Sequence, residues 1–395
     1  MGELGRMRVA LFTDTYLPEV NGVATSTDNL AKMLRKHGHD VLIVTTNPFN
    51  NKIECKDNIL RIPGKEYVYG YRMAKFYSKE AMQYVLDFRP EIVHIQSDVA
   101  IGVFGSFVAA KLKIGSVYTY HTMIEDYAYY VTKGHFDRAA RNIVRLFYRG
   151  KSFLYDEIIT PSDKSKDYLR FIGIDSTISV IPTGIELDRF SRKNEDKELT
   201  TRLKSRFGIA EDETVILSLG RIAEEKSIDV LIRGYERFLK ANPNSKTKMV
   251  ITGWGPAEGG LKALAESLGI KKDVIFTGKV DQDKTQTFYH LGDIFVSASL
   301  SETQGLTFLE AMAAENLVLA RFDDNLVGTI IDGVTGKFFF DEEDFANKLV
   351  DMLKMTPEEK KKMRESALKN LDGYSLETFY QKVMEVYKRV GKKHW

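Results

Sequence analysis

The chain has 395 residues, of which 43% are hydrophobic and 11% aromatic, and its formal net charge is +2. This composition excludes a disordered protein, and the length exceeds what one ordinary hydrophobic core needs, so we expect two domains. The single cysteine, Cys55, excludes a disulfide framework, and no Cys/His cluster has the spacing of a zinc site.

The sequence has no apolar run of ~18 residues and no pattern of a signal peptide. We therefore expect a cytoplasmic chain that does not span a membrane, with residues 1–6 as a leader outside the fold. The small net charge indicates no partner by itself, so any basic surface must be sought locally.

The first half of the chain alternates predicted strands and helices. Residues 8–14 form a β-branched and apolar run that is typical of a buried parallel strand. A loop with Gly22 follows, and then a helix that ends near Gly38, because glycine is favoured just past helix ends. Further strands are predicted at residues 41–45, 92–95, 116–120, 157–160 and 179–181. Gly22 either lets the backbone approach a phosphate or serves an ordinary turn.

His121 directly follows the predicted strand at residues 116–120, with Glu125 and Asp126 close behind. Ligands of α/β proteins bind beyond the carboxyl ends of the strands, so this histidine is a candidate active-site residue. A structural histidine with satisfied hydrogen bonds is the alternative, and the residues alone leave both open.

A basic segment begins shortly after, since no acidic residue lies between Arg138 and Tyr155. Its cations, most of them on one predicted helical stripe, are Arg138, Arg141, Arg145, Arg149 and Lys151. The stretch 61–79 interleaves further cations with the aromatic residues Tyr67, Tyr69, Tyr71 and Phe76. Cations with interfacial aromatics favour an anionic bilayer surface, at about 1 kcal/mol per cation. Nucleic acid is the weaker alternative, because no nucleic-acid motif accompanies them, and a solvated helix face is the other.

The second half repeats the alternation after a charged stretch that reaches about residue 212 and ends in a helix. Strands are predicted at residues 214–219, 248–252, 273–277, 293–297 and 317–320. The order predicts an α/β protein of two doubly wound parallel sheets, whose ligands bind beyond the carboxyl ends of the strands. A last helix at about 376–388 could belong to either domain.

Two cations follow the first strand of the second half. Arg221 offers a planar fork and Lys226 a point charge, which together suit a diphosphate. A solvated helix end paired with Glu224 and Glu225 is the alternative. The nearby Gly253-Trp-Gly turn either admits a ligand or only shapes the backbone.

Two glutamates follow the strand at 293–297. Glu302 lies in a loop and Glu310 in the apolar helix after it, where the N-terminal amides favour phosphate. Carboxylates accept hydrogen bonds from vicinal diols, so the pattern indicates a sugar nucleotide rather than a simple anion. The alternative is an amphipathic helix capped by Ser301 or Thr303.

Three segments together resemble the family-4 retaining glycosyltransferases of GT-B fold, over essentially the whole chain. They are Asp14–Val23, Gly220-Arg221 with Glu225-Lys226, and Glu302 with Glu310 around Gln304-Gly305-Leu306. The resemblance implies two Rossmann-like domains that face each other across a cleft, with the donor held mainly by the second. We expect an acceptor-side domain at 1–188, a nucleotide-sugar domain at 189–372, and a last helix at 373–395 that crosses back to the first.

The resemblance also implies roles for single residues. Arg221 and Lys226 would bind the donor diphosphate, Glu310 the ribose, and Glu302 a hydroxyl of the transferred sugar. The amides of Gln304, Gly305 and Leu306, with Gly22 opposite, would complete the site, and Val280 would contact the base through its backbone. His121 would lie beside the anomeric carbon, which makes His121, Arg221, Lys226 and Glu302 the expected catalytic residues. The chain departs from the family pattern at Ala314–Leu317, where a glycine and a proline commonly stand.

A narrower likeness concerns Tyr120–Tyr130 and Arg321–Gly328, which look like the bacterial diacylglycerol glucosyltransferases. It implies transfer of glucose from UDP-glucose to membrane diacylglycerol with retention, without a metal or cofactor, by an enzyme attached peripherally to the cytoplasmic face of the membrane. Other hexose donors, soluble or polysaccharide acceptors, an epimerase, and a non-catalytic sugar-nucleotide-binding protein are the alternatives. The expected partners are a nucleotide sugar and a lipid acceptor at an anionic surface, without nucleic acid, and the sequence does not predict the oligomeric state.

Overall fold

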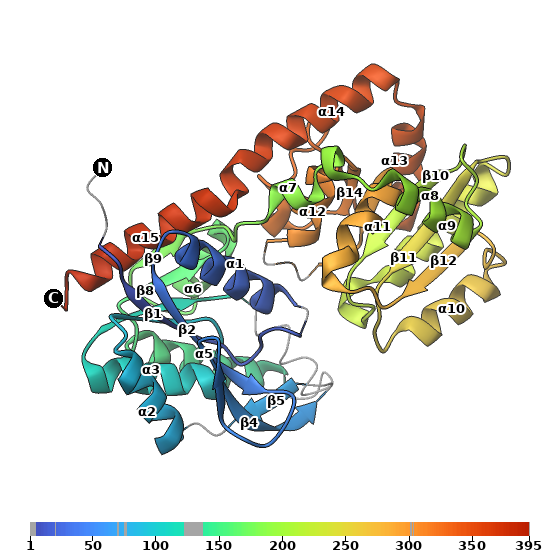
Figure 1. The fold of residues 1–395 in the computed structure, drawn as a ribbon. Helices are drawn as coiled ribbons and strands as arrows, with labels where there is room; N and C mark the ends of the chain where they lie inside the picture. Colours follow the sequence, from blue (N-terminus) through green and yellow to red (C-terminus); the bar gives the residue numbers. More distant parts are fainter. Residues whose placement is uncertain are drawn as a thin grey trace. The chain divides into compact units, whose positions relative to one another are not determined.

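The computed structural model describes residues 5–19, 21–68, 71–74, 77–121, 137–300, 302 and 304–394, the side chains of 66–68, 71, 72, 137–144 and 282 excepted. The chain folds into two compact units (Figure 1). Unit 1 contains the described residues up to Gly184 and those from Leu376 onward, and unit 2 contains Ile185–Ser375. Each unit has a predominantly parallel sheet with helices on both faces, which confirms the predicted fold class.

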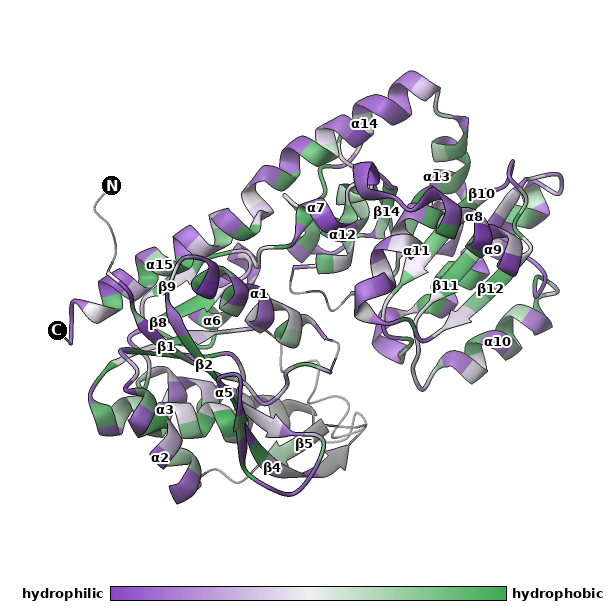
Figure 2. Ribbon diagram, in the orientation of Figure 1, coloured by the Kyte–Doolittle hydropathy of each residue, from purple (hydrophilic) through white to green (hydrophobic). Residues whose placement is uncertain are grey.

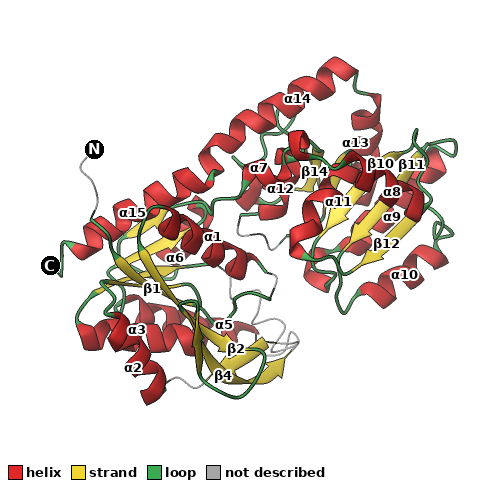
Figure 3. Ribbon diagram, in the orientation of Figure 1, coloured by secondary structure: helices red, strands yellow, loops and turns green. Residues whose placement is uncertain are grey.

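Unit 1 is built on a nine-stranded sheet in the order β3-β4-β2-β1-β6-β7-β8-β9, with β5 paired to β4 (Figure 3). The pairs β3–β4 and β4–β5 are antiparallel, and the other neighbours are parallel. The strands are β1 Arg8–Phe12, β2 Asp40–Asn47, β3 Glu54–Lys56, β4 Ile59–Val68, β5 Tyr71–Ala74, β6 Ile92–Ile95, β7 Gly115–Thr119, β8 Glu157–Thr160 and β9 Ile178–Val180. The helices are α1 Gly22–Lys36, α2 Lys79–Phe88, α3 Ala100–Leu112, α5 Asp137–Ser152, α6 Asp163–Phe171 and α15 Leu376–Gly391.

The central strand β1 shows why an apolar run is needed in this sheet. Its side chains alternate between the two faces, and helices cover both of them. Val9 and Leu11 pack in the core cluster that α1 and α15 complete, whereas Ala10 and Phe12 pack on the other face with Phe104 of α3. Both faces of the sheet are therefore shielded from solvent at β1, as predicted for a parallel sheet.

The last helix, α15, packs against α1 and β7 of unit 1. Tyr387 of α15 is buried, and its hydroxyl lies 2.7 Å from Nδ1 of His94 on β6. Arg389 donates a hydrogen bond of 2.6 Å to Glu157 on β8. The residues alone left this helix unassigned, and its contacts place it in unit 1.

Unit 2 contains a six-stranded, fully parallel sheet in the order β12-β11-β10-β13-β14-β15. The strands are β10 Thr214–Leu219, β11 Thr247–Thr252, β12 Val274–Gly278, β13 Ile294–Ser297, β14 Leu317–Arg321 and β15 Lys337–Phe339. The helices are α7 Leu187–Phe190, α8 Lys197–Phe207, α9 Ile228–Ala241, α10 Glu258–Ser267, α11 Thr285–Leu291, α12 Leu306–Ala313, α13 Glu342–Lys354 and α14 Pro357–Asn370. Short 3-10 turns are η1 Arg192–Asn194, η2 Glu224–Lys226, η3 Gln282–Lys284, η4 Asp324–Leu326 and η5 Leu371–Tyr374. Figure 2 shows hydrophobic residues along the strands and mostly hydrophilic ones along α14.

The structure differs from the sequence-based expectation in four strands and in the positions of the two unit boundaries. The strands β3, β4, β5 and β15 were not predicted, because strands of mixed polarity lack the apolar run of a buried strand. The expected boundaries after residues 188 and 372 fall inside α7 and η5, whereas the units change at Gly184–Ile185 and at Ser375–Leu376.

Within the described part of the chain, no helix combines the length and the apolarity needed to cross a bilayer.

Candidate functional site

The site begins where β10 and β11 end in unit 2, at two loops whose backbones touch. The N–H of Ile222 donates to the carbonyl of Trp254 (3.1 Å), and the N–H of Gly220 donates to that of Thr252 (3.0 Å). A Cβ atom on Gly253, whose φ is 138°, would lie 1.8 Å from the carbonyl oxygen of Gly220. Only glycine fits this close approach, so Gly253 shapes the backbone that presents Gly220 and the residues after it.

Arg221 and Lys226 both follow β10 and have different partners. The Arg221 guanidinium pairs with Glu225 one turn along the chain, as the solvated alternative predicted. Lys226 instead reaches the neighbouring strand's loop, where Nζ lies 2.6 Å from Oε1 of Glu302 and 3.4 Å from Oγ of Ser299. The structure thus joins one predicted cation directly to one predicted acid.

Glu302 is a carboxylate held in its charged form. Burial alone raises the pKa of Glu302, but the charge and hydrogen bond of Lys226 and a hydrogen bond from Ser299 outweigh it, so the net pKa is below the usual value. Asn325, buried after β14, donates its side-chain N–H to the Glu302 carbonyl oxygen. Asn325 was missed as a site residue, although it lies in the segment Arg321–Gly328 that carried the narrower likeness.

Helix α12 begins at this loop without a capping side chain. Its N-cap is Gly305, in the left-handed conformation with φ 71°, rather than the predicted Ser301 or Thr303, which lie outside the described residues. A Cβ atom on Gly305 would lie 2.7 Å from both Leu326 and Phe308. The first-turn amides from Leu306 onward therefore have no side-chain acceptor from the cap and suit an anionic ligand.

Glu310 extends from α12 toward α11. Its Oε2 accepts a hydrogen bond of 2.7 Å from the hydroxyl of Tyr289. Burial raises the pKa of Glu310 to about 7, against the opposing effects of Tyr289 and of the charge of Arg189. After burial, the charges of Glu310 and Glu302 both raise the pKa of Tyr289, so the two glutamates lie near one phenol. Tyr289 was also missed, since no motif includes it.

The other residues predicted in unit 2 flank this arrangement. Gln304 is buried beside Gly305, and Val280 is partly buried against the core after the end of β12. The departure at Ala314–Leu317 is accommodated, because Glu315 takes the left-handed φ of 58° that favours glycine. Asn316 then donates two hydrogen bonds, to the carbonyls of Tyr289 and Gly292.

His121 and Gly22 lie in unit 1. His121 follows β7, and its Nε2 lies 2.6 Å from Oε1 of Gln96, which follows the neighbouring strand β6. Burial lowers the pKa of His121 to about 4, so the ring is neutral at ordinary pH. Gly22 is the first residue of α1, and Asn21 caps that helix by accepting the N–H of Ala24 (2.9 Å).

Comparisons with known proteins give matches over nearly the whole chain. Two family models match: Glycosyltransferase Family 4 over residues 20–189 and Glycosyl transferases group 1 over residues 200–370. An alpha-monoglucosyldiacylglycerol synthase of Streptococcus pneumoniae is 38% identical over 388 residues, which cover 96% of this chain and 85% of that protein. A protein of the same name from Acholeplasma laidlawii is 34% identical over 360 residues, 89% of each chain. The chain belongs to the family-4 glycosyltransferases.

Solved structures place this glycosyltransferase among GT-B folds. The Anabaena protein HepE, solved in complex with UDP-glucose, matches with a TM-score of 0.76 at 14% identity. The match covers 97% of this chain and 100% of HepE. Sucrose-phosphate synthase from Thermosynechococcus elongatus has a TM-score of 0.77 at 18% identity, over 98% and 100% of the two chains. At sequence identities this low, the structural likeness shows the fold alone, and it confirms the predicted GT-B architecture.

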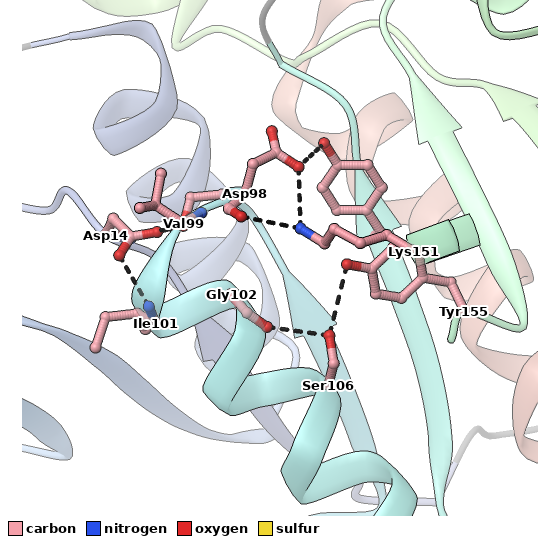
Figure 4. A network of polar contacts seen from close by, with 10 residues as sticks. Asp14, Asp98, Val99, Ile101, Gly102, Ser106, Lys151 and Tyr155 are labelled. Atoms are coloured by element: carbon pink, nitrogen blue, oxygen red, sulfur yellow. Dashed lines mark hydrogen bonds and ion pairs between the residues drawn. The ribbon is translucent and has the colours of Figure 1, made fainter. Parts of the chain in front are cut away.

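The predicted basic surface of the glycosyltransferase needs one correction. Lys151 is not an exposed cation: its side chain is only 7% exposed, and its ammonium donates to the carbonyl (3.0 Å) and the carboxylate (3.4 Å) of Asp98 (Figure 4). The run of cations in the sequence did not predict this, because Asp98 comes from the loop after β6, far away in the sequence. Arg145 and Arg149 are not buried, and Arg145 stacks over the ring of Phe171 at 5.5 Å.

Large apolar side chains accompany these two arginines. Around the end of α5 and on α6, Leu146 is 66% exposed, Phe153 88% and Phe171 76%. Exposure of this size on neighbouring elements is typical of an interaction surface. Six further predicted surface residues lie outside what the structure describes, either entirely or in their side chains: Arg138, Arg141, Tyr67, Tyr69, Tyr71 and Phe76.

Proposed function

We propose that the protein transfers glucose from UDP-glucose to the free hydroxyl of 1,2-diacylglycerol, with retention, to give α-monoglucosyldiacylglycerol. The observation that carries the proposal is the near full-length identity of 38% and 34% to two alpha-monoglucosyldiacylglycerol synthases. The arrangement of Lys226, Glu302 and Glu310 supports it, because it offers one cation and two carboxylates to a sugar nucleotide.

In this proposal, unit 2 binds the donor. Arg221 and Lys226 contact the diphosphate, and Lys226, whose side chain is 29% exposed, can share its charge between Glu302 and a phosphate oxygen. The uncapped amides at Gly305 and Leu306 add donors for the same anion. Preorganised charge of this kind stabilises the negative charge that develops on the departing diphosphate, which is usually the largest catalytic contribution.

The two glutamates hold hydroxyls of the donor. Glu302 is ionised and accepts a hydrogen bond from the transferred sugar, while Asn325 fixes the backbone of its loop. Glu310 accepts from the ribose diol with the oxygen that Tyr289 leaves available. Val280 contacts the base through its backbone, and His121 of unit 1 contacts the transferred sugar.

The chemical step exchanges one C–O bond for another on the same face of the sugar. The bond from the anomeric carbon to the diphosphate breaks, the bond to the acceptor oxygen forms, and the acceptor's proton passes to the leaving diphosphate. We favour this route over a covalent intermediate, because the described carboxylates near the donor site are engaged with Lys226 and Tyr289 rather than paired as in retaining glycosidases. We expect the reaction to need no metal and no cofactor, so turnover should persist in a chelator.

The acceptor is reached at a membrane surface in this proposal. Arg145 and Arg149, with the exposed Leu146, Phe153 and Phe171, support a peripheral contact with an anionic bilayer on the cytoplasmic face. Lys151 takes no part in this contact. Flotation with vesicles tests the point: recovery with the soluble fraction regardless of anionic lipid would exclude it.

One product analysis tests the reaction. The purified protein is incubated with UDP-glucose, UDP-galactose or UDP-N-acetylglucosamine, and with diacylglycerol vesicles or a soluble acceptor. We expect a glycolipid only from UDP-glucose and diacylglycerol, with an α anomeric proton in the NMR spectrum. A product from another donor, or one formed equally well without lipid, would replace the proposed donor or acceptor.

A further inference from the structure

Gln96 occupies a buried position at the carboxyl end of β6, beside the candidate His121. The residue is 2% exposed, and its backbone N–H donates to the carbonyl of Phe12 on the adjacent strand (2.7 Å). Its side-chain Oε1 lies 2.6 Å from Nε2 of His121. Because this contact is short and the amide is buried, Gln96 interacts directly with one ring nitrogen of His121.

The loop that carries Gln96 is fixed on its first side by Asp14. This carboxylate, placed after β1, accepts three hydrogen bonds from the segment that follows Gln96 (Figure 4). The donors are Ser97 Oγ (2.6 Å), the N–H of Val99 (3.1 Å) and the N–H of Ile101 (2.8 Å). Asp14 thereby holds the loop against the start of α3.

Asp98 fixes the same loop on its other side. Its carboxylate accepts a hydrogen bond from the hydroxyl of Tyr118 on β7, and its carbonyl accepts one from Lys151 of α5 (Figure 4). The loop is therefore held from the two neighbouring strands β1 and β7 and from the helix α5, and the position of Gln96 leaves its amide little freedom. A rigid support of this kind is what a precisely oriented functional side chain requires.

The chemistry of the contact determines the tautomer of His121. An amide oxygen can only accept, so the proton of a neutral ring must sit on Nε2. Nδ1 then carries a lone pair and can only accept. Among the described residues, no hydrogen bond to Nδ1 is formed. Both ring nitrogens of His94, the neighbouring histidine, have other partners, Tyr387 and Thr119.

We propose that Gln96 is a positioning residue that holds His121 as the neutral Nε2–H tautomer, so that Nδ1 accepts a hydrogen bond from a hydroxyl of the donor sugar. The tautomer follows from unit 1 alone, whereas the sugar hydroxyl rests on the function proposed above. A site that accepts from a hydroxyl discriminates against an analogue that cannot donate, because the acceptor is then left unpaired. Gln96 would thus contribute to specificity without touching the substrate.

Nitrogen-15 NMR tests the tautomer directly on the full-length protein without substrate. The seven histidines are labelled with nitrogen-15, and the signals of His121 are assigned by their loss in His121→Asn. We expect a protonated Nε2 and an unprotonated Nδ1 at neutral pH. A proton on Nδ1, which the opposite amide orientation would cause, or a doubly protonated ring would overturn the proposal.

A double-mutant cycle tests the functional coupling. Gln96→Met keeps the length of the side chain and removes its hydrogen bond, so kcat/KM should fall about tenfold. His121→Asn should cost at least as much, and adding Gln96→Met to it should change nothing further. Gln83→Met, an exposed glutamine on α2, is the matched control and should retain full activity.

The outcomes of the cycle separate the two proposals. The double variant could instead lose kcat/KM by the product of the two single losses from Gln96→Met and His121→Asn. That result would refute positioning through His121, even if the glucosyl transfer itself is demonstrated. Failure of the wild type to make glycolipid would refute the proposed function while leaving the NMR result on the tautomer intact. Unchanged thermal unfolding in Gln96→Met shows that the loss of activity does not come from loss of fold.

Discussion

Each unit contains a lysine that pairs with a carboxylate from a distant loop, and the two pairs differ in burial. The Lys226 and Glu302 side chains are 29% and 15% exposed, and their charged atoms lie 2.6 Å apart. The Lys151 and Asp98 side chains are 7% and 13% exposed, at 3.4 Å. A partly exposed lysine can share its charge with a ligand, whereas a buried one must keep its partner.

The surroundings of the two ammonium groups deepen this difference. The ammonium of Lys151 lies 5.0 Å from the ring centroid of Phe147 and 5.6 Å from that of Tyr118, and it donates to a backbone carbonyl. Lys226 has a carboxylate and the hydroxyl of Ser299 as its described partners. We therefore assign Lys226 to donor binding and Lys151 to the fold of unit 1.

The sharpest test of this comparison is Lys226→Ala. Loss of the cation removes stabilisation from the leaving diphosphate, so kcat/KM for glucosyl transfer should fall about 10²- to 10³-fold. Because the Glu302 side chain is only 15% exposed, its carboxylate loses its cation in this variant, so thermal unfolding is measured alongside to separate loss of activity from loss of fold. The matched control is Lys262→Ala, which removes another lysine–glutamate pair (Glu258, 2.6 Å) on α10, and it should keep full activity. Near-normal turnover in Lys226→Ala would remove this lysine from the site.

The converse prediction concerns stability. Lys151→Met keeps the aliphatic contacts and leaves the carboxylate of Asp98 buried without its cation, which should cost about 3 kcal/mol of unfolding free energy. Urea denaturation measures it. Lys111→Met, an exposed lysine on α3, should lie within about 0.5 kcal/mol of the wild type. A wild-type midpoint in Lys151→Met would show that the pair contributes nothing to the fold.

The two glutamates of the donor site should respond differently to pH. Glu302 has a lowered pKa and stays ionised, whereas the pKa of Glu310 is about 7. Because a ribose diol binds the carboxylate, the affinity for UDP-glucose should be full above pH 8 and fall about tenfold for each unit below 7. Calorimetric titration of UDP-glucose is suited to this, since neither of its phosphates titrates in that range. Glu310→Gln should abolish the dependence, and a dependence that survives would assign it to another group.

The sequence predicted most of the fold because buried parallel strands are short apolar runs. Strands β6, β8 and β10 begin and end where the pattern placed them. The hairpin of β4 and β5 was missed, since both strands mix polar and apolar residues and lack the apolar run of a buried strand. The sheet order and the placement of α15 follow from long-range packing, which a single sequence does not display.

The candidate site was predictable where chemistry and spacing coincide. The loops after β10 and β13 carry Lys226 and Glu302, and these strands are neighbours in the sheet, so their meeting follows from topology. Gln96 and Tyr289 were missed, because each acts through a partner from another element and belongs to no motif. Lys151 was misassigned for the same reason: its partner Asp98 comes from the loop after β6, and the run of cations around Lys151 in the sequence does not show that contact.

The smallest expected effect concerns Arg149, which is exposed on the same helix as the buried Lys151. Arg149→Gln should weaken binding to vesicles with anionic lipid about fivefold, which corresponds to about 1 kcal/mol per cation near the surface. The same change at the exposed Lys369 of α14 in unit 2 is the control for total charge, and it should leave vesicle binding unchanged. Sedimentation with vesicles of graded anionic content measures both. Because salt screens exposed charges, the difference between the variants should vanish near 1 M salt. Equal losses from Arg149→Gln and Lys369→Gln would mean that net charge, and not the surface of α5 and α6, brings the protein to the membrane.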